Sequence, residues 1–142
     1  MIVLDTNVVS EPLKLAPNPA VLDWLNAQEP QTLFLTAVNL AELLAGVEAL
    51  PAGRRRDALA QALSTQVFAL FGGRILPFDA KAAQAFATTN ASAQAQGNTI
   101  GFADCAIAAI TRANGFALAT RNLRDFKGAG VSLIDPWDFA KP

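Results

Sequence analysis

The sequence predicts an α/β domain with three layers, in which a central, mostly parallel sheet of four to five strands is flanked by helices. Short apolar runs of strand length alternate along the chain with longer helical patterns, and this alternation is typical of parallel βαβ units. The chain has 142 residues, of which 52% are hydrophobic and 16% charged, so it can bury one core of ordinary size. We therefore expect a single domain over residues 1–142.

The expected strands are short and apolar. The first covers Ile2–Leu4 and is stopped by Asp5, which is the pattern of a strand buried on both faces. Four later segments resemble it, at residues 33–35, 74–77, 116–120 and 131–134.

Helices are expected between these strands. Asn18, Thr36 and Asp79 are residues that cap helices well, and Pro51 and Gly97 are residues that end them. The expected helices cover residues 19–28, 37–50, 53–70, 80–96 and 101–113. In the second of these helices, the residues with helical spacing that we expect to face the core are Leu40, Leu43, Leu44 and Val47.

The composition excludes several classes of site and of partner. There is no histidine, which removes Ser–His–Asp and Cys–His catalysis and every His-containing zinc site, so any metal must be a hard ion held by oxygen. The net charge of −1 argues against a protein that coats nucleic acid, although it is compatible with a nuclease that has a local basic rim. No apolar run reaches the roughly 18 residues of a membrane span. One cysteine and no export signal predict a cytoplasmic protein.

Three carboxylates lie where a surface residue is not expected. Asp5 follows a buried strand at the sheet edge where parallel folds bind ligands, although a turn or capping role is the alternative. Asp104 falls on the apolar stripe of its helix with no basic residue one turn away, although the helix dipole also favours an acid near a helix N-terminus. Glu42 lies on the second face of a helix that is apolar nearly all round, so it lines a cleft or a subunit contact unless it is simply solvated.

The loop after the expected fourth strand supplies further polar groups. Asn122 and Asp125 offer oxygens and Thr120 offers a hydroxyl, and an ion pair of Asp125 with Arg121 or Arg124 is the alternative. Three to four carboxylates in one cleft would repel each other, and a divalent cation resolves that repulsion. An all-oxygen site suits Mg²⁺ or Mn²⁺, which activate water and neutralise charge in phosphodiester cleavage.

Four segments carry these polar residues in order along the chain. They are MIVLDTNVVSEP at residues 1–12, LTAVNLAE at 35–42, IGFADCAIAA at 100–109 and ATRNLRDF at 119–126. Together they resemble the motifs of PIN-domain proteins, and in particular those of the VapC toxins of bacterial toxin–antitoxin pairs, in the branch that includes FitB-like proteins. Four motifs in order over the full length are far more specific than any one of them.

The resemblance implies a Mg²⁺-dependent endoribonuclease that a cognate antitoxin, encoded alongside it, holds inactive. It also implies a homodimer and an acidic metal site formed by Asp5, Glu42 and Asp104. Many relatives carry an acid where this chain has Asn122, so either the carbonyl oxygen of Asn122 or the carboxylate of Asp125 would complete the site. A site with asparagine there has one charge fewer, and we expect a lower metal affinity.

The expected mechanism is metal-assisted hydrolysis of RNA. Asp5 and Asp104 would bind the metal directly. Glu42 would either hold the metal through a water molecule or act as the base that takes a proton from the attacking water. The polar residues expected to orient these carboxylates or the water are Thr6, Asn7 and Thr120. The basic residues nearest to the expected site, which are candidates for contacts to RNA phosphates, are Arg121, Arg124 and Lys127.

Two other functions are compatible with the sequence. Another Mg²⁺-dependent phosphoester hydrolase, such as a phosphatase of the haloacid dehalogenase type, would need Asp-x-Asp, whereas Asn7 stands two residues after Asp5. A catalytically inactive PIN-like binding module would use its acids for structure alone.

The remaining large or reactive side chains that we expect to pack in the core are Trp24, Phe68, Phe71, Phe78, Phe86 and Cys105.

Overall fold

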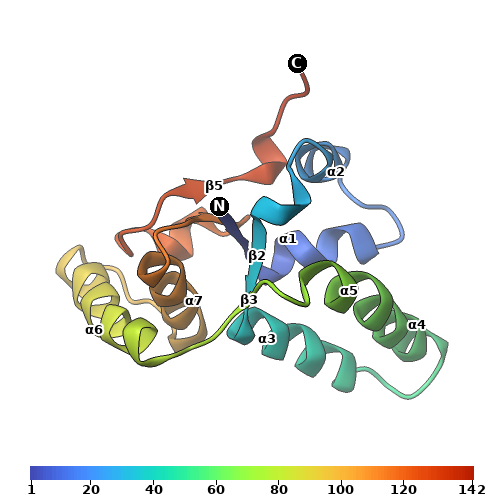
Figure 1. Cartoon of the computed structure of the whole chain (residues 1–142), viewed down its shortest axis with the longest axis horizontal. Helices are drawn as coiled ribbons and strands as arrows, with labels where there is room; N and C mark the ends of the chain where they lie inside the picture. Colours follow the sequence, from blue (N-terminus) through green and yellow to red (C-terminus); the bar gives the residue numbers. More distant parts are fainter.

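The computed structural model describes residues 1–142 and contains one five-stranded sheet (Figure 1). All neighbouring strands run parallel, in the spatial order β3–β2–β1–β4–β5. The strands are β1 (Ile2–Leu4), β2 (Leu33–Thr36), β3 (Ile75–Leu76), β4 (Ala117–Ala119) and β5 (Leu133–Ile134). Each overlaps an expected strand, so the predicted fold class is confirmed, and the sheet is parallel throughout rather than mostly parallel.

The helices agree best with the sequence where a capping residue begins them. The side chains of Asn18, Thr36 and Asp79 each accept a hydrogen bond from a backbone N–H in the following turn. The helices within the expected segments are α2 (Pro19–Asn26), α3 (Ala37–Glu48), α4 (Arg54–Ala62), α5 (Phe68–Phe71), α6 (Ala80–Ala95) and α7 (Phe102–Ala113). None of the helices is both long enough and apolar enough to cross a membrane.

One expected helix is divided. The segment at residues 53–70 forms α4, a π-helical turn η3 (Leu63–Val67) and then α5. Leu63 and Val67 are both buried, whereas no residue of α4 is. Leu63 and Val67 lie four residues apart and both face the core, but the sequence did not predict the π turn that contains them.

A short helix directly after β1 was not predicted from the sequence. α1 (Thr6–Ser10) and the 3₁₀ turn η1 (Glu11–Leu13) follow β1 without a loop. Three of the five residues of α1 are β-branched, and such residues disfavour helices. Burial of Val8 and Val9 in the core stabilises this helix instead.

Two apolar clusters, one on each face of the sheet, produce the three layers. Successive residues of a strand point to opposite faces, so Leu4 packs in a cluster with Trp24 and Leu43, while Val3 packs in another with Ile107. Figure 1 shows α6 and α7 on one side of the molecule and α4 and α5 on the other. The burial of Trp24 confirms its expected place in the core.

Three positions that we expected in the core are exposed. Leu44 is 41% exposed, and Phe68 and Phe78 are each 37% exposed. α3 buries only Asn39 and Leu43, so its inward-facing stripe is narrower than the helical spacing of its leucines suggests. The other expected core side chains are buried (Phe71 and Cys105) or half-buried (Phe86).

Candidate active site

The order of the strands defines where the site lies. From β1, the chain adds β2 and β3 on one side of the sheet and β4 and β5 on the other, so the order reverses between β1 and β4. In parallel α/β sheets, ligands bind at the carboxyl ends of the strands at such a reversal. The register pairs Leu4 with Ala119, which brings the next residues, Asp5 and Thr120, side by side at this carboxyl edge.

Asp5 is buried at the carboxyl edge, with 4% of its surface exposed. Its Oδ2 accepts a hydrogen bond from Oγ1 of Thr120 at 2.7 Å, and its Oδ1 accepts from the backbone nitrogen of Thr6 at 2.8 Å and from Nδ2 of Asn39 at 3.3 Å. All three donors are neutral, and no basic residue pairs with Asp5. Burial outweighs these hydrogen bonds and raises the pKa of Asp5, and the charge of Asp125 adds to the rise.

Asn39 is a residue of the site that sequence reasoning missed. It is fully buried and forms a capping box at the start of α3, in which its backbone N–H donates to Oγ1 of Thr36 at 3.0 Å and its Oδ1 accepts from the backbone N–H of Thr36 at 3.2 Å. Its amide nitrogen then donates to Asp5 and to Oγ1 of Thr6. The signal was present in the sequence, because Thr36 is followed three residues later by a side chain that can accept a hydrogen bond, as in a capping box.

Glu42 lies one helical turn beyond Asn39 and is directed toward the same edge. It is exposed, and its Oε1 accepts a hydrogen bond from Oγ1 of Thr6 at 2.7 Å. Thr6 therefore connects two carboxylates, because its backbone N–H donates to Asp5 and its hydroxyl donates to Glu42. Glu42 is thus part of a hydrogen-bonded network at the carboxyl edge rather than simply solvated.

Asp104 lies in the first turn of α7 and is half-buried, with no ion-pair partner. Burial raises the pKa of Asp104 to about 6, and the negative charges of Asp5, Asp125 and Glu42 contribute to the rise.

The neighbouring thiol of Cys105 is buried and its pKa is also raised, so it packs in the core and is not an activated nucleophile.

Asp125 lies in the 3₁₀ turn η4 (Leu123–Phe126), in the loop after β4. It is exposed, and its charge raises the pKa of both Asp5 and Asp104. It forms no ion pair with the arginines on either side of it in the loop, which the sequence had left open.

The four carboxylates that influence one another at the carboxyl edge are named the acidic cluster here: Asp5, Glu42, Asp104 and Asp125. The protein has two ion pairs, and neither includes a member of the cluster. Like charges therefore face one another without a protein cation, and a bound cation would relieve their repulsion.

The other polar residues that we expected at the site make different contacts. Thr6 and Thr120 donate to carboxylates of the cluster. Asn7 instead accepts a hydrogen bond at Oδ1 from the backbone N–H of Arg121 at 3.3 Å, so it holds the loop after β4. Asn122 donates its backbone N–H to Oγ1 of Thr120 at 3.0 Å, and it is exposed.

The three basic residues that we expected near the site have no carboxylate partner. The guanidinium carbon of Arg121 lies 5.3 Å from the centre of the Trp137 ring, within the range of a cation–π contact. Arg124 and Lys127 line one shallow hollow together with two leucines. Because none of the three is in an ion pair, their positive groups are available to an anionic ligand.

The donor chemistry of the acidic cluster fits a hard divalent cation. Every side-chain atom of the cluster that could bind a metal is an oxygen. A bound positive charge would also counter the repulsion that contributes to the raised pKa of Asp104. No three Asp, Glu or Cys side chains converge closely enough to form a complete protein cage for a metal. This arrangement suits Mg²⁺, which is usually bound by one or two carboxylates and several waters, better than calcium or structural zinc.

Comparisons with known proteins find relatives over nearly the whole chain. A family model described as the PIN domain matches residues 2–131. VapC ribonuclease Y4jK from Sinorhizobium fredii is 46% identical over 138 residues, which cover 97% of this chain and 99% of that protein. The chain is a PIN-domain protein of the VapC family.

Two further comparisons relate this VapC-family chain to FitB. Toxin FitB from Neisseria gonorrhoeae is 39% identical over 137 residues, which cover 96% of this chain and 99% of that protein. The crystal structure of FitAcB from Neisseria gonorrhoeae has a TM-score of 0.93 and 39% identity, and the match covers 98% of this chain and 100% of that chain. The resemblance drawn from the sequence motifs is therefore confirmed.

We expect the stability of this VapC-family chain to depend on pH through Asp104. Because the pKa of Asp104 is raised from 3.8 to about 6, the folded state binds more protons than the unfolded state between these values, and stability falls as the pH rises through them. With divalent ions chelated, Asp104→Asn should therefore unfold at a higher temperature than the wild type near neutral pH. The difference should disappear below pH 3.8, where the wild-type carboxyl is protonated in both states.

Thermal unfolding followed by circular dichroism across this pH range measures the effect. Glu29→Gln removes an exposed carboxylate outside the acidic cluster and should leave the pH profile of the wild type unchanged. If Asp104→Asn has the same pH profile as the wild type, the repulsion within the cluster does not affect stability.

Proposed function

We propose that this protein is the toxin of a type II toxin–antitoxin pair, a Mg²⁺-dependent endoribonuclease that hydrolyses RNA phosphodiester bonds at the acidic cluster. The observation that carries the proposal is the state of Asp104, a half-buried carboxylate without a cation partner in the field of three other carboxylates. Residues whose pKa is shifted by burial and like charge are commonly functional. The names of two relatives, VapC ribonuclease Y4jK and Toxin FitB, support the same activity.

Asp5 and Asp104 would hold the Mg²⁺ ion, and Mn²⁺ would suit the same oxygens. A carboxylate has roughly four acceptor positions, and hydrogen bonds occupy three of those of Asp5, which leaves room for a cation. The same three bonds fix the orientation of Asp5 before any ligand binds. When bound, the ion would neutralise charge on the scissile phosphate and lower the pKa of a water molecule.

Glu42 would hold the proton that the attacking water loses. Its Oε1 is engaged by the hydroxyl of Thr6, and the side chain is exposed, so Oε2 is free to accept a proton. The network from Asn39 through Thr6 to Glu42 would keep this carboxylate at a fixed distance from Asp5.

The basic residues of the loop after β4 would contact the RNA backbone. Arg124 and Lys127 share one hollow and have no carboxylate partner, and Arg121 lies next to Thr120 in the sequence, at the carboxyl edge. Positive side chains commonly position nucleic acid through its phosphates without reading its sequence.

We propose that the whole chain, residues 1–142, acts as one PIN domain in a cytoplasmic homodimer that a cognate antitoxin silences. The toxin name of FitB supports the antitoxin partner. The single, buried cysteine is compatible with a reducing compartment.

The observations do not favour the other two functions. In a phosphatase of the haloacid dehalogenase type, Asn7 would be replaced by a second acid, whereas here Asn7 holds the backbone of Arg121. A catalytically inactive binding module would gain nothing from unpaired carboxylates, because their repulsion destabilises the fold.

Asp125 is the better candidate than Asn122 for the fourth group of the site, because its charge acts on both Asp5 and Asp104. Asp125→Asn should weaken Mn²⁺ binding roughly 10- to 100-fold, whereas Asn122→Ala should change it much less. Isothermal titration of each purified variant with Mn²⁺ measures the difference. The reverse order of effects would assign the fourth position to Asn122.

Asp5→Asn and Asp104→Asn should each reduce Mg²⁺-dependent RNA cleavage by at least about 100-fold, because each removes a negative charge that would hold the ion. Both variants should remain folded, since asparagine has nearly the same shape as aspartate. Gel analysis of labelled single-stranded RNA measures cleavage, and circular dichroism checks the fold. Glu29→Gln is the matched control, and cleavage at the wild-type rate by either cluster variant would refute the proposal.

Expression of the wild-type chain without an antitoxin should slow bacterial growth, because uncontrolled RNA cleavage depletes RNAs that the cell needs. Expression of Asp104→Asn to the same level should not slow growth. Growth curves with immunoblots of the soluble protein measure both. Unimpaired growth with soluble, full-length wild-type protein would count against the toxin role even if the purified enzyme cleaves RNA.

A further inference from the structure

The most exposed aromatic side chain of the protein lies in the same helical turn as Asp104 of the acidic cluster. Phe102 is 72% exposed, and it is the first residue of α7, two residues before Asp104. Leaving most of a phenylalanine in water forgoes most of the free energy of burying it, so the stability of the isolated chain does not explain this exposure. We propose that Phe102 is a stacking surface for a nucleobase of single-stranded RNA that flanks the scissile phosphate, an inference that rests on the proposed ribonuclease function.

The ring of Phe102 is supported from behind by two other phenylalanines. Its centre lies 6.5 Å from that of Phe78, with the ring planes 6° apart, and 5.2 Å from that of Phe86, with the planes 46° apart. Phe86 in turn packs against the apolar cluster under α7. Sequence reasoning placed Phe78 and Phe86 in the core and overlooked Phe102. The structure shows instead a ladder from the core to the surface that holds the outer ring in place.

This support favours binding of a planar ligand. A ring that is already held in position loses little conformational freedom when a base stacks on it, so most of the stacking free energy contributes to affinity. The ring is also open to solvent, because 72% of the surface of Phe102 is exposed.

The place of Phe102 on the helix indicates which nucleotide it would contact. Side chains two residues apart leave an α-helix about 200° apart, so Phe102 and Asp104 lie on different sides of α7. A helix with its side chains is roughly 10–12 Å across. A single strand that places one phosphate at Asp104 reaches Phe102 within a few nucleotides, so the stacked base flanks the cleavage position.

Charge favours a base over a phosphate at this position. The acidic cluster repels phosphate groups that are not neutralised by a cation, whereas the face of a nucleobase is uncharged. Stacking on aromatic side chains is a common way to hold single strands, and it tolerates different sequences because every base has a flat face.

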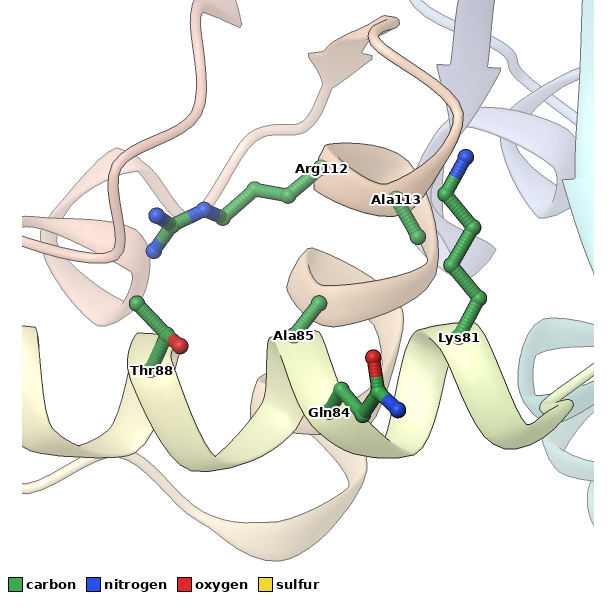
Figure 2. A pocket seen from close by; sticks show the side chains of 6 residues that line it. All are labelled: Lys81, Gln84, Ala85, Thr88, Arg112 and Ala113. Atoms are coloured by element: carbon green, nitrogen blue, oxygen red, sulfur yellow. The ribbon is translucent and has the colours of Figure 1, made fainter.

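The surroundings of the ring do not suit a protein partner. A stable protein interface commonly buries about 1,200–2,000 Å², and the exposed parts of Phe102 and Phe78 would supply a small part of that. The groove between α6 and α7 is lined mostly by polar side chains, namely Lys81, Gln84, Thr88 and Arg112 (Figure 2). None of the three phenylalanines lines this groove, so the apolar surface at Phe102 does not extend into it.

The test is a comparison of RNA binding by full-length Phe102 variants, with Ca²⁺ in place of Mg²⁺ to slow cleavage. Phe102→Ala should raise the Kd for a labelled, mixed-sequence single-stranded RNA roughly 5- to 150-fold. Phe102→Trp should bind as well as the wild type or better, because its larger ring also stacks. Phe68→Ala, at the partly exposed phenylalanine of α5, is the matched control and should leave the Kd unchanged.

A second measurement locates the stacked base. In RNAs that carry one abasic ribose at successive positions, the wild type should lose affinity at one flanking position, and Phe102→Ala should be insensitive at that same position. A 2-aminopurine placed there should lose fluorescence on binding to the wild type, because stacking quenches it, and should lose much less on binding to Phe102→Ala.

The other outcomes separate a failure of this inference from a failure of the proposed nuclease function. Wild-type affinity of Phe102→Ala for RNA overturns the inference. If that variant also changes the oligomeric state in light scattering, the ring belongs to a contact between copies of the chain. Failure of the wild type to bind RNA at all overturns this inference. Binding without Mg²⁺-dependent cleavage leaves the stacking result valid but refutes the proposed nuclease function.

Discussion

The hydrogen bond from Thr120 to Asp5 joins residues 115 positions apart in the chain, and it fixes where charged chemistry can occur in this fold. It forms because the parallel pairing of β1 with β4 aligns Leu4 with Ala119, so that the next residue of each strand lies at the same edge of the sheet. Asp5 is thereby removed from water, yet its donors are neutral hydroxyl and amide groups. The negative charge is held in place without being cancelled, which keeps it available to a cation.

The acidic cluster departs locally from what stabilises a folded protein. Buried charges are normally paired, but Asp104 is half-buried among three like charges and has no partner. The two apolar clusters of the sheet offset this cost, and a bound divalent ion would reduce it. Such local strain is typical of functional sites, because selection preserves the chemistry of the site while the rest of the fold supplies stability.

The first turn of α7 presents two kinds of surface. Asp104 belongs to the acidic cluster on one side, and Phe102 joins the aromatic ladder with Phe78 and Phe86 on another. The carboxylates that act on the phosphate would thus be separated from the ring that holds a base. A change at an exposed ring does not disturb the sheet or the carboxylates, so the affinity for the strand can vary while the reaction is kept.

The sequence by itself determined what depends on neighbouring residues: the alternation of strands and helices, the caps at Asn18 and Asp79, and an acid placed directly after a buried strand. Only the tertiary structure decided that α1 forms, that the amide of Asn39 reaches Asp5, and that Phe102 faces solvent. These features depend on which distant segments come together. A periodic pattern shows which residues of one helix or strand face the same way, but it does not show what they meet.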